Sequence, residues 1–294
     1  MKISRRGSMN TRNTGSKRKR RIKKALIYLL ITLIAFVMIF PLIWMIFASF
    51  KPSNEVFDNS HLLPRVWKFD NFVNGWNGVK PYSYLKFYLN TFLLVGGVIV
   101  GNLFSSSVVG YGFARGRFKG KSFLFSLLMG TMMLPGTVTM IPNFIIFNKL
   151  GWINTYLPFI IPAFCGGTFF IFLMVQFMKG IPMELDEAAR IDGCGSFQIF
   201  LKIILPMCKP TLTTVAIFSF VWTWDDFMGQ LIYISEMNKY TVALALKIMV
   251  DPLAAIDWGA VIAMSLLSVI PSVILYFLAQ DHFVEGITTS GLKG

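Results

Sequence analysis

Charge is scarce in this sequence, and its scarcity excludes an ordinary water-soluble domain. Only 14% of the 294 residues are charged, whereas a soluble globular domain carries about 25%. Hydrophobic residues make up 55% of the chain, and the mean hydropathy is +0.62. So few charges cannot cover the surface of a water-soluble fold of this size. The composition therefore indicates a protein for which lipid is the main solvent.

Cysteine and histidine are also rare, which excludes two ways of building a site. The three cysteines, Cys165, Cys194 and Cys208, include no CxxC pair, and their odd number does not suggest a disulfide framework. His61 and His282 are far apart in sequence, and neither has a partner at ligand spacing. We therefore expect no metal ion and no cofactor bound by this chain.

Catalytic motifs are absent as well. The sequence contains no GxSxG, HExxH or EF-hand pattern. The nearest approach to a nucleotide-binding loop is GRFKGKS at residues 116–122, but a phosphate-binding loop needs four residues between its first glycine and Gly-Lys-Ser. Here there are three, and Arg115 stands where that glycine should be. We predict that the chain is not an enzyme, has no catalytic residue and does not hydrolyse ATP itself.

Long uncharged stretches are what the sequence does contain. A bilayer core about 30 Å thick requires about 20 apolar residues in a helix. One such stretch, residues 122–148, is interrupted by Pro135 and Gly136. The first stretch, residues 25–50, is too long for a signal-peptide core and has no small-residue cleavage site, so it should remain as an anchor. We predict an all-α membrane protein with six transmembrane helices, at residues 25–50, 87–114, 122–148, 155–178, 210–232 and 258–280.

Basic residues set the predicted orientation. Residues 1–24 hold eleven Lys and Arg and no acid. A basic tail is compatible with nucleic-acid binding, but one that directly precedes a span is better explained as a topology determinant that also touches anionic lipid. With this tail inside, 20 of the 28 Lys and Arg lie in inner segments. We predict a disordered tail, both termini in the cytoplasm, and a multi-pass protein of the cell membrane that binds no nucleic acid.

One polar segment between the fourth and fifth spans is more ordered than a simple loop needs. It reads MELDEAARIDGCG, residues 183–195. Its early acids suit the positive end of a helix dipole. Asp186 and Arg190 have the i,i+4 spacing of a helical ion pair, and Gly193 can end the helix in a left-handed conformation. Ser196 can cap a second helix, whose apolar face would contain Phe197, Phe200, Leu201 and Ile204.

These two short helices allow two interpretations. They fit an amphipathic loop in the membrane interface, and they also fit a docking site for another protein. The acids argue against contact with an anionic leaflet, and the small alanines would let a partner's backbone approach closely. The docking interpretation is therefore favoured.

The same residues carry a resemblance to a known family. Glu187-Ala188-Ala189, Asp192-Gly193 and Ile204-Leu205-Pro206 match the EAA---G---------I-LP signature, which is specific in its spacing. In this respect the sequence resembles permease subunits of ABC importers, and the resemblance covers the chain from about Ala25 to its end. It is similar in particular to the carbohydrate branch, of the maltose-transporter second-permease type, at Trp224–Phe227, Leu231–Tyr233, Phe283–Ile287 and Gly291–Gly294.

The resemblance implies a type I ABC importer permease architecture with a coupling loop at residues 180–206. Such permeases work by alternating access, driven by ATP hydrolysis in a separate subunit that binds ATP and Mg. Cys194 departs from the family, which has a small alanine there, but a cysteine is small enough for docking to be retained. The C-terminal tail, with Gly286, Gly291 and Lys293, is a second expected contact with the ATPase. The coupling residues implied by the resemblance are Glu187, Ala188, Ala189, Asp192 and Gly193.

The resemblance also implies partners. They are a second permease subunit in what is favoured to be a heterodimer, two cytoplasmic ATPase subunits and an extracytoplasmic sugar-binding protein, besides the membrane lipid. Which sugar is carried is not encoded in any readable motif. A permease for another solute (a glycerol phosphodiester, an amino acid or a peptide) stays open as an alternative, as does a stand-alone secondary transporter. A membrane-embedded enzyme would need a polar catalytic pair within the spans, and none is visible.

A second polar cluster lies near the outer end of the predicted fifth span. Trp222, Trp224, Asp225 and Asp226 combine aromatic faces with carboxylates, which suits the recognition of a sugar ring in a transport pathway. The same residues also fit an interfacial tryptophan belt with its acids in the headgroup region. In the family, asparagine is more common at position 225, and the partner permease of maltose-type systems makes the main sugar contacts.

Polar and small residues inside the spans predict contacts between helices. Asn90, Asn102 and Asn143 are expected to form helix–helix hydrogen bonds. The pairs Gly96–Gly97 and Gly166–Gly167 are expected to allow close packing or bending.

Overall fold

The computed structural model describes residues 12–58, 60–251 and 255–291, and it includes their side chains except at 12–19 and 281–291. Every regular element in this described part is a helix, in agreement with the predicted all-α class. In chain order the elements are α1 (Arg12–Ala48), α2 (Asp70–Trp76), α3 (Tyr84–Arg115), α4 (Lys121–Thr131), α5 (Gly136–Lys149), α6 (Leu157–Cys165), α7 (Thr168–Gly180), α8 (Glu184–Ile191), α9 (Ser196–Ile199), η1 (Phe200–Ile204), α10 (Leu205–Met207), α11 (Lys209–Asp225), α12 (Phe227–Tyr233), η2 (Met237–Lys239), α13 (Val242–Met249) and α14 (Trp258–Gly291).

Several helices are long and apolar enough to cross a membrane. Two candidates are bent pairs, α4 with α5 at 99° and Ser196–Met207 with α11 at 74°. Pro135 precedes the first residue of α5, so the predicted interruption of the third stretch is present. Among the described residues, four further candidates are single spans: Arg20–Ala48, Tyr84–Arg115, Leu157–Gly180 and Trp258–Gln280. The total is six spans if each bent pair crosses once.

The predicted fifth span, residues 210–232, is not one helix. α11 ends at Asp225, and α12 begins at Phe227. The Asp226 side chain accepts a hydrogen bond from the backbone N–H of Gly229 at 2.9 Å, and so caps the first turn of α12. The break follows from this cap, because a residue at an N-cap position has left the helical conformation of the preceding segment.

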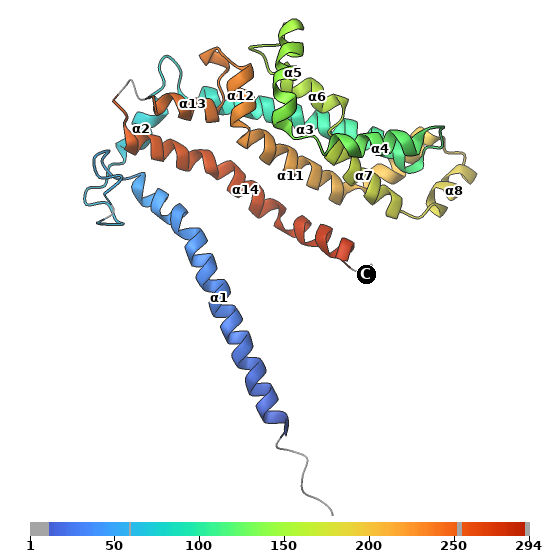
Figure 1. The fold of residues 1–294 in the computed structure, drawn as a ribbon, viewed down its shortest axis with the longest axis horizontal. Helices are drawn as coiled ribbons and strands as arrows, with labels where there is room; N and C mark the ends of the chain where they lie inside the picture. The colour runs from blue at the N-terminus through green and yellow to red at the C-terminus, as the bar shows by residue number, and fades with distance from the viewer. Residues whose placement is uncertain (1–11, 59, 252–254, 292–294) are drawn as a thin grey trace, which may run out of the picture.

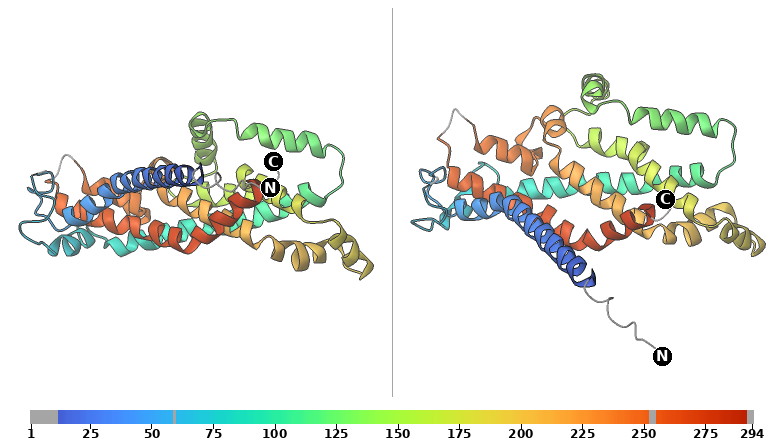
Figure 2. Two further views of the ribbon diagram at one scale, coloured as in Figure 1. Left: turned by 90° about the horizontal axis from the view of Figure 1, so that it is seen from below. Right: turned by 60° about the horizontal axis from the view of Figure 1, so that its bottom comes forward.

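α1 begins earlier than predicted. Residues 12–24, which we expected to be disordered, form the first turns of this helix. Lys and Arg are good helix formers, and the apolar helix that follows them removes the cost of nucleation. Residues 1–11 of the predicted tail lie outside the described part. α1 leaves the body at an angle (Figure 1, Figure 2), and its most apolar stretch has no buried residue.

The C-terminal end of α1 is anchored by polar contacts. The Asn71 side chain, from α2, donates hydrogen bonds to the carbonyls of Ser49 and Lys51, both at 2.8 Å. The buried Lys51 ammonium donates to the His61 carbonyl at 2.6 Å. These bonds hold the loop that follows α1 against α2.

α3 is the spine of the body. In Figure 1 it runs from α2 and α13 at the left to the region of α8 at the right, and we call its two ends the Tyr84 end and the Arg115 end. The Asn102 side chain donates to the Ser219 hydroxyl of α11 at 3.0 Å, which confirms one predicted helix–helix hydrogen bond. Close packing at Gly97 is also confirmed, because a Cβ there would lie 2.7 Å from the Ile160 side chain of α6.

The predicted bend at Gly166–Gly167 is confirmed as the break between α6 and α7. Gly166 has a φ of +112°, which side chains with a Cβ rarely allow. The last carbonyls of a helix have no partner within it, and here the Ser105 hydroxyl of α3 donates to the Ala163 carbonyl at 2.7 Å. The break is thus satisfied by the neighbouring helix, as apolar surroundings require.

Candidate functional site

α8 is the ordered core of the polar segment predicted from the sequence. Three acids lie in its first turn and Arg190 lies in its last, the arrangement that a helix dipole favours. Gly193 has a φ of +84° and ends the helix as predicted. The N–H of Cys194 donates to the Ala189 carbonyl at 2.9 Å, and that of Gly193 donates to the Arg190 carbonyl at 3.0 Å. These two bonds form a Schellman motif, which satisfies carbonyls at the end of α8.

The two faces of α8 differ in exposure. Asp186 and Ala189 are buried against the body. On the other face, Ile191 is 87% exposed, which is unusual for so apolar a side chain. Of the five coupling residues predicted from the resemblance, Ala189 therefore faces inward, whereas four are exposed: Glu187, Ala188, Asp192 and Gly193.

Asp186 pairs with a residue that the sequence did not indicate. Its Oδ2 lies 3.2 Å from Nε of Arg115, the last residue of α3, and the two side chains are only 2% and 5% exposed. The predicted pair of Asp186 with Arg190 is wrong, because Asp186 faces the body and Arg190 is exposed. The Arg115 guanidinium also donates to the Ile181 carbonyl at 2.8 Å. One cation thus contacts both α8 and the link that enters it from α7.

An apolar cluster lies beneath α8 and joins it to α7 and α11. Cys194 packs against this cluster and is partly buried, so its small apolar side chain has a packing role. The buried members of the cluster are Phe170, Met174, Met178, Ile181, Ala189, Ile199, Phe200, Ile204, Cys208 and Val215.

The second predicted helix differs in detail from the expectation. Its cap is Gly195, whose N–H donates to the Gln198 side chain at 3.1 Å, rather than Ser196. Residues 200–204 form a π-helical turn, which changes the angle between successive side chains. Of the predicted apolar face, Phe200 and Ile204 are buried. Phe197 and Leu201 instead line an apolar groove of about 580 Å³ between this segment, α3 and α11.

The predicted pathway residues do not gather into one site. The half-exposed Trp222 packs on Phe169 and Phe170 of α7. Trp224 is buried and its indole N–H donates to the Ser268 carbonyl of α14 at 3.1 Å. Asp226 caps α12, and Asp225 is exposed. Trp222 and Asp225 therefore keep surface free for another molecule, and a pathway role for the four residues stays a prediction.

The predicted second contact lies at the end of the chain. Gly286 and Gly291 are on α14, and Lys293 lies outside the described residues. As to metals, no group of three or more His, Cys, Asp or Glu in the described part could hold an ion.

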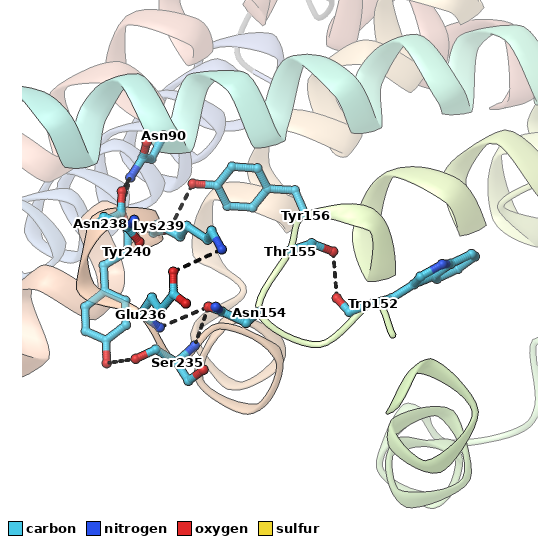
Figure 3. Close-up of polar contacts among 10 residues, drawn as sticks. All are labelled: Asn90, Trp152, Asn154, Thr155, Tyr156, Ser235, Glu236, Asn238, Lys239 and Tyr240. Carbon is cyan, nitrogen blue, oxygen red and sulfur yellow. Dashed lines mark hydrogen bonds and ion pairs between the residues drawn. The ribbon is translucent and has the colours of Figure 1, made fainter. Parts of the chain in front are cut away.

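A polar network at the Tyr84 end was not expected from the sequence (Figure 3). Asn154 has a positive φ of 61°, its N–H donates to the Tyr233 carbonyl at 2.7 Å, and its side-chain oxygen accepts from the N–H groups of Ser235 and Glu236. The Tyr156 hydroxyl donates to the Lys239 carbonyl at 2.9 Å. Asparagine tolerates positive φ better than most residues, and this was the one available signal.

Asn90 joins α3 to the same network. Its side chain donates to the carbonyls of Asn238 and Tyr240, at 2.9 and 2.8 Å. Asn90 therefore does not join two long helices: its partner Asn238 lies in the single-turn helix η2 and Tyr240 follows it, both in the loop between α12 and α13. Within that loop the Lys239 ammonium, 3.1 Å from the Glu236 carboxylate, lowers the pKa of Glu236 below its usual value.

Comparison with known proteins gives consistent matches. Residues 106–288 match the family described as "Binding-protein-dependent transport system inner membrane component". The chain is 37% identical to the probable ABC transporter permease protein YurM of Bacillus subtilis (strain 168), over 91% of this chain and 87% of that protein. It is 34% identical to the arabinooligosaccharides transport system permease protein AraQ of Halalkalibacterium halodurans, over 89% and 93% of the two chains.

One solved structure matches most of the fold. It is the crystal structure of a bacterial ABC transporter involved in the import of the acidic polysaccharide alginate. The TM-score is 0.80 at 22% identity, and the match covers 94% of this chain and 100% of that chain.

Proposed function

We infer that this chain, which belongs to the family of binding-protein-dependent transport system inner membrane components, is the membrane-spanning permease subunit of an ABC importer for a sugar or oligosaccharide. Similarity to the arabinooligosaccharide permease AraQ over most of both chains supports the substrate class. The single observation that carries the proposal is α8, a capped helix with a charged and apolar exposed face that stands at one end of the body.

In this proposal α8 is the part that docks onto a separate ATPase subunit. Glu187, Ala188, Asp192 and Gly193 meet the partner directly, whereas the buried Ala189 lets α8 lie close to its own support. ATP and Mg bind to the ATPase, and this chain supplies the pathway. The tail with Gly286, Gly291 and Lys293 is a second proposed contact with the ATPase.

The proposed topology has six spans, with the two bent pairs each crossing once and both termini in the cytoplasm. The Arg115 end is the cytoplasmic one. This orientation is supported by the basic turn that follows α3, where Arg115, Arg117, Lys119 and Lys121 lie within seven residues, because cytoplasmic loops are enriched in Lys and Arg. α8 then faces the compartment that contains ATP.

The remaining partners follow from the same proposal. A second permease subunit completes the pathway, and a sugar-loaded binding protein docks at the Tyr84 end. α4 and α5 contain no buried residue in this chain, which supports a position facing the second subunit or the pathway. Trp222 and Asp225 are the proposed sugar-facing members of the aromatic and acidic cluster.

The test uses the importer assembled from its permeases, ATPase and binding protein in liposomes. Gly193→Pro removes the left-handed turn, because proline fixes φ near −65°, and Glu187→Arg reverses a charge on the docking face. Both should abolish uptake of sugar without preventing insertion into the membrane. Normal uptake by Gly193→Pro would refute the proposal. A thermal-shift screen of the binding protein against arabino-, galacto- and malto-oligosaccharides would identify the sugar.

A further inference from the structure

α8 has few connections through which it can move the spans. Its backbone enters from α7 through Ile181 and leaves through Gly193 and Gly195. Glycine links transmit force poorly because they bend easily. Among the residues whose side chains the structure describes, the side-chain connections are the apolar cluster beneath α8 and the buried pair of Asp186 with Arg115.

We propose that Arg115 and Asp186 are positioning residues that make α8 and α3 move together, so that closure of the ATPase reaches the pathway through α3. This proposal rests on the proposed function. Arg115 is suited to the role because it terminates α3 and also holds the Ile181 carbonyl, at the entry to α8. A single side chain thus fixes the first turn of α8 and the preceding link to the same point.

The geometry of the Arg115–Asp186 pair allows it to stay formed when α8 changes its orientation. Among the described residues, neither Arg115 Nε nor Asp186 Oδ1 has a hydrogen-bond partner, so the pair is held by charge rather than by an aligned hydrogen bond. Attraction between charges falls only as the inverse of their distance, whereas apolar contacts lose about a quarter to a half of their energy over a gap of 0.5–1 Å. Burial of both side chains also limits screening by salt. The pair therefore persists when α8 tilts.

α3 can carry the movement far into the molecule. It packs on α6 and α11 in its middle, through Gly97 and the Asn102–Ser219 bond. At the Tyr84 end the Thr91 hydroxyl accepts from the N–H of Val242 at 3.0 Å, next to the contacts of Asn90. A displacement of the Arg115 end of α3 is therefore transmitted to the contacts at its Tyr84 end, where the proposed pathway opens on the extracytoplasmic side.

The experiment measures sugar imported per ATP hydrolysed by the complete importer in liposomes. The probe is a tritium-labelled mixture of arabinotriose, galactotriose and maltotriose. Asp186→Asn keeps the shape and an acceptor oxygen but removes the charge, and should lower the ratio about tenfold while the ATPase remains bound. Asp186→Glu restores the carboxylate and should recover most of the ratio. A purely structural role would lower uptake and hydrolysis together, so an unchanged ratio overturns the proposal.

Two further variants keep the test decisive. If Asp186→Asn fails to assemble, the double variant Arg115→Gln/Asp186→Asn leaves no lone buried charge, and a normal ratio in it overturns the proposal. Arg117→Gln removes an exposed cation two positions away and should leave the ratio unchanged. An equal loss in Arg117→Gln would assign the effect to net charge and overturn the role of the pair. If the unsubstituted complex binds no ATPase or imports none of the sugars, the proposed function fails instead.

Discussion

The two ends of α3 are held in different ways. At the Tyr84 end, neutral amide side chains bond to backbone groups: Asn90 holds a loop to α3, and Asn154 holds two loops to one another (Figure 3). At the Arg115 end, one buried ion pair and an apolar cluster hold α8. A buried apolar cluster lies at each end, so the difference is between neutral amide hydrogen bonds at one end and a buried ion pair at the other.

The different contacts at the two ends of α3 indicate which end keeps a fixed geometry. Hydrogen bonds between amides and carbonyls weaken steeply with distance and angle, so the Tyr84 end has one favoured geometry. The attraction between the two charges at the Arg115 end changes little when their distance changes slightly. With the glycine turn at Gly193, this charge pair lets α8 tilt while α8 stays attached to α3. α3 thus holds loops in a fixed geometry at its Tyr84 end and holds α8 in a movable attachment at its Arg115 end.

The largest effect should come from leaving a charge unpaired at the movable end. Asp186→Ala strands the Arg115 guanidinium in a buried position, and should lower the free energy of unfolding by about 3–5 kcal/mol. Denaturant titration in detergent micelles measures this change. Arg190→Ala on the exposed face of the same helix is the control and should stay within about 0.5 kcal/mol. Equal losses in both variants would contradict the role given to burial.

A smaller effect is expected from separating the helices between the two ends. Gly101→Ala places a methyl group 2.9 Å from the Ala163 Cβ, and should cost about 1–3 kcal/mol through overpacking. Gly96→Ala is the matched control, because no atom lies within 4 Å of its new Cβ. The control should be neutral or slightly stabilising, since alanine is the better helix former. Titration of both variants in the same detergent distinguishes packing from helix propensity.

At the Tyr84 end, a substitution should reduce the stability of the nearby loops alone. Asn154→Ala removes the side-chain acceptor. It also places alanine at positive φ, a conformation that alanine disfavours and that asparagine can stabilise with its own side chain. We expect the free energy of unfolding to fall by about 1–2 kcal/mol. Hydrogen exchange of residues 234–241 should accelerate, while that of α8 stays the same. Asn154→Gly keeps the backbone conformation and should lose less. Faster exchange at α8 would mean that the two ends are not independent in this respect.

The smallest effect concerns the exposed Glu236–Lys239 pair. Lys239 lowers the pKa of Glu236, so the pair stabilises the loop above the unfolded carboxyl pKa and loses this contribution as the pH falls through the lower folded value. Glu236→Gln should slightly accelerate hydrogen exchange in the loop at neutral pH, and the difference should vanish once the pH falls below the folded pKa of Glu236. A difference that persists in acid would exclude the ion pair as its cause.

Local features of the sequence predicted local features of the structure well. Uncharged length located the candidate spans, Gly193 located the end of α8, and Gly166–Gly167 located the break between α6 and α7. Each of these depends on neighbours in the chain. The break at Asp226 was missed because a capping aspartate looks the same as an acid at the membrane surface until its partner N–H is known.

Long-range pairing was where the sequence was insufficient. The i,i+4 spacing favoured Arg190 as the partner of Asp186, but the inward orientation of that carboxylate depends on how α8 lies on the body. Asn90 was expected to bond to another spanning helix and bonds instead to carbonyls of η2 and of the residue after it. In both cases the residue type correctly predicted a polar contact, and tertiary packing chose the partner.

The position of Arg115 in the chain has a consequence for how the protein is made. Arg115 and Ile181 are separated by 66 residues, and the intervening chain contains four helices, α4 to α7. During synthesis the guanidinium emerges long before either of its partners exists. Its two contacts can form only after these four helices have been synthesised. The contacts that hold α8 in place therefore form only once more than half of the chain is present.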